Sequence, residues 1–152
     1  MWTCKRLYQA KISPSPICLR CLQGTETLEH LFIFCSKTNT IWDIAVKYMR
    51  AVCPKLHIHN KFKAIISGFS DIPELKPVLS ALEDIRLAFF KAVWFQRNRM
   101  LHDFQDINGI KLFQNFLQNF VTQRFLSNPN DPLPPLRTIY SREKDLLILI
   151  KL

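Results

Sequence analysis

The chain has 152 residues, of which 48% are apolar and 12 are phenylalanine, so it can bury the core of a single domain. Lysine and arginine outnumber aspartate and glutamate by 21 to 12, which favours polyanionic partners, nucleic acid first; an ordinary basic solvated surface is the alternative. No apolar run approaches the roughly 18 residues of a membrane span, so we expect no membrane partner.

Residues 1–17 are basic at Lys5, Arg6 and Lys11 and then contain the run Ser13-Pro-Ser-Pro16. Because a residue before proline avoids the helical region, we expect an extended basic lead-in without an element of its own. The first residues lack the apolar stretch of a secretory signal. This predicts an intracellular, reducing compartment, either nucleus or cytoplasm.

Residues 18–35 have the spacing of a structural metal site. Cys18-x2-Cys21 is followed, after eight residues, by His30-x4-Cys35, so two ligand pairs are separated by a loop. Zn²⁺ is bound tetrahedrally by thiolate and imidazole, and four protein ligands leave no open position for a reactive water. The pattern predicts a structural zinc site; the alternative is that the four groups are ordinary core.

The run from Cys18 to Trp42 resembles the zinc-binding domain found downstream of the polymerase in non-LTR retrotransposon reverse transcriptases. The matching features are the four ligands, Glu29 just before the histidine, Phe32 after it, and Trp42 seven residues past the last cysteine. Further along, Trp94-x2-Arg97-Asn98 resembles a second signature of that family. The resemblance spans roughly residues 15–103.

Two positions depart from the family pattern. Members often carry proline after the first cysteine and glycine after the second, whereas this chain has Leu19 and Leu22 there and Gly24 later. The departures concern the first turn and leave the ligand set intact. Since this domain follows a polymerase region in relatives, a methionine 17 residues upstream of the motif suggests a truncated or remnant chain.

Residues 26–34 and 37–52 are predicted helices. His30 and Cys35 are five apart, which on a regular helix separates them by about 140° around the axis. We therefore expect a kink near residues 34–36, with Ser36 as the N-cap of the next helix. Cys35 would then lie at the positive helix end, which favours a thiolate. Trp42 is expected to form a lid over the zinc site, with stacking on a base as the alternative.

Beyond Pro54 the pattern is ambiguous until about residue 77. Cys53, His57 and His59 offer three candidate ligands without a fourth, so we expect no second metal site. Residues 77–104 and 112–126 then show two long amphipathic helices whose apolar faces can pack together, and Gln96 interrupts the apolar stripe of the first.

Four basic residues are candidates for nucleic-acid binding: Arg20, Lys37, Arg97 and Arg99. Each can contribute salt-sensitive affinity for phosphate. For Arg97 and Asn98 a structural role is favoured instead, in which hydrogen bonds tie the helix to the zinc module.

The expected fold is mainly α, with a small Cys-Cys-His-Cys zinc module followed by a helical domain, together covering residues 18–127. Residues 128–140 are rich in proline and are expected to form a linker. Residues 141–152 form a tail that either docks as a terminal helix or stays exposed.

The sequence contains no Asp-Asp pair, which polymerase chemistry needs for its metal ions, and no glycine-rich phosphate loop. We therefore expect no enzyme activity from this chain alone. One hypothesis is a zinc-stabilised nucleic-acid-binding module, with RNA favoured over DNA, which in a longer chain assists a polymerase region. The alternatives are a structural protein-interaction module and a retroelement remnant without function.

Overall fold

The computed structural model describes residues 1–127, and the predicted linker and tail lie outside this range. The fold is mainly α, as predicted. Its elements in chain order are α1 (Cys4–Gln9), the π-helical turn η1 (His30–Phe34), α2 (Ser36–Val52), α3 (Lys61–Ile66), the 3-10 helix η2 (Pro73–Val78), α4 (Leu79–His102) and α5 (Gly109–Ser127). We refer to residues 1–35 as the metal module and to residues 36–127 as the helical body.

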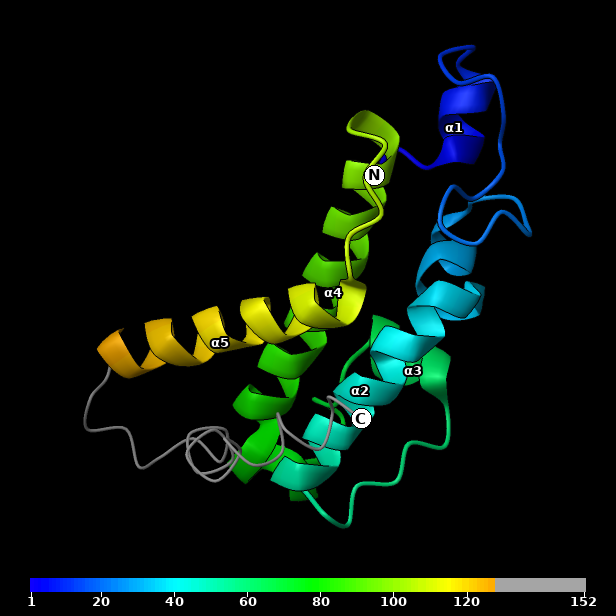
Figure 1. The fold of residues 1–152 in the computed structure, drawn as a ribbon. Coiled ribbons are helices and arrows are strands. Elements are labelled where there is room, and N and C mark those ends of the chain that lie inside the picture. The colour runs from blue at the N-terminus through cyan, green and yellow to red at the C-terminus, as the bar shows by residue number, and fades with distance from the viewer. Residues whose placement is uncertain (128–152) are drawn as a thin grey trace.

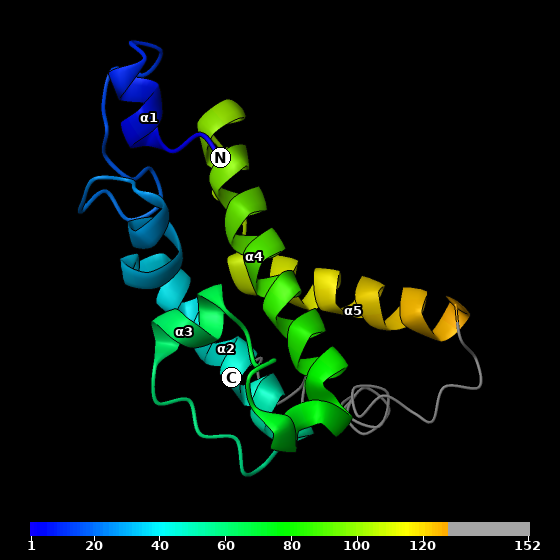
Figure 2. The same cartoon turned by 180° about the vertical axis from the view of Figure 1, so that it is seen from behind.

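The helical body is built around α4, which packs against both α2 and α5. Figure 1 shows α4 running the length of the molecule, while the far end of α5 extends away from the other helices; Figure 2 shows the same arrangement from behind. Aromatic pairs mark the contacts. Trp42 of α2 meets Phe89 of α4 edge to face at 5.1 Å between ring centroids, and Phe95 of α4 meets Phe116 of α5 at 5.9 Å.

Helices α4 and α5 fall where the sequence predicts two long amphipathic helices. The second begins three residues earlier than predicted, at Gly109, because the Asn108 side chain caps it. Asn108 Oδ1 accepts hydrogen bonds from the N–H groups of Ile110 and Lys111 at 3.0 and 3.1 Å. Within residues 1–127, no helix has both the length and the apolar character needed to cross a membrane.

The prediction that residues 1–17 lack an element of their own is wrong. Residues Cys4–Gln9 form α1, which begins at the N-cap Thr3. This helix belongs to the metal module, and backbone hydrogen bonds hold its first turn against the loop that contains Glu26. The N–H of Cys4 donates to Glu26 Oε1 at 2.8 Å, and that of Lys5 donates to the Glu26 carbonyl at 3.3 Å. Proline acts only on the residues near it, so Ser13–Pro16 does not prevent a helix that ends at Gln9.

Candidate metal centre

Four metal-ligating side chains converge in the metal module. Their ligand atoms all lie within 4.8 Å of one another, and they belong to Cys18, Cys21, His30 and Cys35. Nε2 of the histidine lies 3.2 Å from the Cys21 sulfur, so this ring nitrogen faces the cluster. The cluster can hold a metal ion. In the described part of the chain, Cys53, His57 and His59 do not gather into a second group of this kind.

A short hairpin positions the first ligand pair. An isolated antiparallel bridge joins Ile17 to Thr25, and the Cys18 N–H donates to the Gly24 carbonyl at 2.7 Å. Between these ends the chain turns sharply enough for Leu22 to adopt a φ of 57°, in the left-handed region. A Cβ at Gly24 would lie 3.3 Å from the His30 ring, a tight contact that would require the ring to shift by a few tenths of an ångström.

The second ligand pair is brought together by a π-helical turn. The Cys35 N–H donates to the His30 carbonyl at 2.7 Å, a bond between residues five apart. A turn that closes over five residues holds one residue more than an α-helical turn. It therefore returns Cys35 to the side of His30, which a regular α-helix would not do. The predicted departure from α geometry is present, and it begins at His30 rather than near Phe34.

Cys35, and not Ser36, is the N-cap residue of α2; Ser36 is already the first helical residue. The predicted cap is therefore displaced by one position, since Cys35 has the extended conformation (ψ 124°) that an N-cap needs.

The pKa of Cys35 is lowered to about 4, chiefly by a hydrogen bond with the Cys18 thiol. The Arg20 charge and the first N–H groups of α2 also lower this pKa, while burial opposes them. The same hydrogen bond and burial raise the pKa of Cys18. A bound metal ion would replace this shared proton, because thiols bind metals as thiolates.

Arg20, between the first two ligands, is buried and holds the hairpin against the helical body. Its guanidinium donates to Thr38 Oγ1 at the start of α2 and to Gln96 Oε1 on α4, the latter at 2.7 Å. Thr38 in turn donates to the Leu31 carbonyl at 2.7 Å. Burial lowers the pKa of Arg20, while the neighbouring cysteine charges act in the opposite direction. The polar Gln96 lies within the apolar stripe of α4 because its side chain accepts the hydrogen bond from Arg20.

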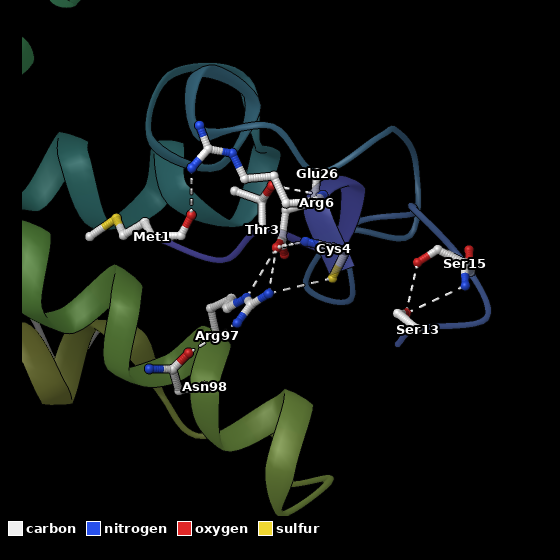
Figure 3. Close-up of polar contacts among 9 residues, drawn as sticks. All are labelled: Met1, Thr3, Cys4, Arg6, Ser13, Ser15, Glu26, Arg97 and Asn98. Carbon is white, nitrogen blue, oxygen red and sulfur yellow. Dashed lines mark hydrogen bonds and ion pairs between the residues drawn. The ribbon is translucent and has the colours of Figure 1, made fainter. Parts of the chain in front are cut away.

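Arg97 provides a second connection between α4 and the metal module, shown in Figure 3. Its side chain is 2% exposed, and its guanidinium forms an ion pair at 2.9 Å with Glu26, which is fully buried. It also donates to Asn98 Oδ1 at 3.1 Å and lies 3.7 Å from the sulfur of Cys4. Burial and the Glu26 carboxylate raise the pKa of Cys4. The Glu26 carboxylate thus joins α1, the ligand loop and α4.

The candidate nucleic-acid residues divide into two pairs. Arg20 and Arg97 are buried in the contacts described above, so neither guanidinium is free to meet a phosphate, and this assignment is wrong for both. Lys37 and Arg99 are exposed, although Arg99 forms an ion pair with Asp103, the C-cap residue of α4. Sequence reasoning did not identify Glu26 and Thr38, because a single acidic or hydroxyl residue in a loop or helix has no distinctive spacing.

Trp42 is buried in the core against Phe89. Its ring therefore has no exposed face on which a base could stack, and that alternative is excluded. The role of Trp42 as a lid over the ligands stays a prediction.

The ligand set fits a tetrahedral metal ion. With metal–sulfur bonds of about 2.3 Å, neighbouring ligand atoms in a tetrahedral site lie about 3.8 Å apart, which is compatible with a cluster contained within 4.8 Å. Comparisons with protein-family models, curated proteins and solved structures gave no match. The geometry of the site therefore carries the functional argument.

Proposed function

We propose that this chain is a zinc-stabilised nucleic-acid-binding module, with RNA as the favoured ligand and without polymerase activity of its own. The observation that carries the zinc assignment is the convergence of three cysteines and one histidine on a single point. Three soft sulfur ligands with one imidazole select Zn²⁺ over magnesium or calcium, which prefer oxygen. Four protein ligands give the ion a structural role.

Nucleic-acid binding is supported by the net charge of +9 and by the positions of several exposed cations. Lys5, Arg6 and Lys11 are exposed on the metal module, and Lys37 is exposed at the start of α2, two residues after the last ligand. Such cations attract phosphates by a long-range, salt-dependent interaction. The resemblance to a reverse transcriptase zinc-binding domain favours RNA among the possible polyanions.

A structural protein-interaction module is the second candidate, and a specific observation favours it. The metal module exposes several large apolar side chains, among them Trp2, Tyr8, Ile12 and Phe34. A partner protein could cover these side chains. In that case the metal and the two buried arginines, Arg20 and Arg97, would hold the metal module in the conformation that exposes these apolar side chains.

Metal analysis and one binding titration test these assignments. The purified protein should contain one zinc per chain, measured by elemental analysis. Its affinity for single-stranded RNA should fall about 50-fold between 50 and 200 mM salt if four phosphates are contacted. Zinc without salt-sensitive binding would favour the protein-interaction module, and a protein purified without metal that does not take up zinc would refute the zinc assignment.

A further inference from the structure

Phe104 lies in the loop between α4 and α5, and the fold does not account for its position. Its side chain is 91% exposed, the largest value among the exposed large apolar residues of the described chain. Its φ of 53° lies in the left-handed region, directly after the C-cap Asp103, where helices commonly continue with glycine. A bulky residue here is strained, and its ring gains no packing in return. Such strain is frequently found at binding sites.

The residues that follow Phe104 are held firmly against the helical body. Gln96 of α4 donates from Nε2 to the Ile107 carbonyl at 2.5 Å and to Asp106 Oδ1 at 3.2 Å. At Gly109 the backbone comes so close to α2 that a Cβ would lie 2.5 Å from Ile41 Cδ1. The loop is therefore pre-organised, which reduces the entropy that a ligand would have to remove.

The same loop forms one side of a hollow of about 350 Å³, whose other side is the start of α2. Ile41 and Ile107 give the hollow an apolar lining, while Asp106 and Asn108 offer polar groups. Lys37 also lines it and has no ion-pair partner among the described residues. An apolar lining beside polar groups and a lysine without an ion-pair partner can accommodate a nucleotide, whose base has apolar faces and whose phosphate is anionic.

We propose that the loop of residues 103–108 binds the unpaired bases of single-stranded nucleic acid, with Phe104 as the stacking surface. A neighbouring nucleotide occupies the hollow, and Lys37 meets a phosphate there. This inference rests on the proposed nucleic-acid binding and adds the class of ligand. An exposed ring can stack on any unpaired base, whereas the bases of a duplex are already stacked on one another.

The test uses the zinc-loaded protein and a fluorescent RNA of about 12 nucleotides, within the site sizes of single-strand binders. Phe104→Gly should raise Tm by about 2–4 °C, because glycine relieves the left-handed strain. The same substitution should weaken RNA binding by about 5- to 150-fold, the effect of losing one stacked base. Phe104→Trp should preserve the affinity. Phe62→Ala, which removes another exposed phenylalanine on α3, should leave it unchanged.

The outcomes separate the two proposals. If the wild-type protein binds no nucleic acid, both are wrong. If it binds RNA and Phe104→Gly binds equally well, the stacking site is wrong while nucleic-acid binding stands. Binding of an RNA duplex as tightly as the single strand would also overturn this inference. Equal binding of single-stranded DNA would support it, since stacking does not depend on the sugar.

Discussion

The metal module and the helical body are stabilised by different interactions. The body buries a continuous apolar core contributed mainly by α2, α3, α4 and α5, and the module adds only three residues of η1 to it, Leu31, Phe32 and Ile33. The rest of the module is connected by polar groups: the four ligands, the Arg20 hydrogen bonds and the Arg97–Glu26 ion pair. Hydrophobic burial can therefore stabilise the body without metal, whereas the module depends on its ligands and on two buried arginines.

Removing one metal ligand should separate the two regions most clearly. Cys21→Ser is expected to abolish tight metal binding, which in small zinc peptides contributes about 10–16 kcal/mol of apparent folding free energy. Hydrogen exchange should then show loss of protection in residues 1–35, while α2, α4 and α5 remain protected. Global loss of helicity by circular dichroism would mean that the body also depends on the metal.

The matched control for this experiment lies in the core of the body. Phe89→Leu should lower the free energy of unfolding by about 1–2 kcal/mol, because it leaves space beside Trp42. Its metal content should stay the same as that of the wild type.

The Arg97–Glu26 ion pair tests the connection between the regions. Arg97→Met should reduce the free energy of unfolding by about 3–5 kcal/mol in a chemical denaturation experiment, because Glu26 would remain buried without a cation. The metal affinity should fall as well, since Glu26 lies in the loop between the ligand pairs.

Two further variants define the cause of that loss. Arg97→Met combined with Glu26→Gln should recover part of the stability, since no buried charge is left unpaired. Arg99→Met, which removes an exposed ion pair on the same helix, should cost less than about 1 kcal/mol. Equal losses for Arg97→Met and Arg99→Met would contradict the proposed connection.

The smallest expected effect concerns the hairpin of the metal module. Leu22 is 72% exposed and has a left-handed φ of 57°, so Leu22→Gly should stabilise the module by about 1 kcal/mol. Leu22→Ala removes the same exposed side chain but keeps the Cβ, so it should bring no such gain. Equal stability of the two variants in thermal denaturation would show that backbone strain is not the limiting factor.

Much of the architecture could be predicted because it depends on local patterns. Apolar periodicity located α2, α4 and α5, and the spacing of Cys18, Cys21, His30 and Cys35 identified the ligand cluster. The five-residue separation of the last two ligands also indicated that a regular α-helix could not join them. The sequence did not predict that this turn is π-helical, nor that α2 begins at Ser36, the residue expected to be its N-cap. Both features depend on backbone hydrogen bonds that no residue type specifies.

The roles of the arginines could be decided only by the tertiary structure. In sequence, Arg20 and Arg97 are indistinguishable from cations that bind phosphate. In the fold, Arg20 reaches Gln96 across 76 residues and Arg97 reaches Glu26 across 71. A guanidinium can bind a phosphate or a buried protein oxygen equally well, and only the packing of α4 against the metal module determines which of them it meets. Local spacing therefore determined the candidate ligands and the main helices, while long-range packing determined which charges are buried and which remain exposed.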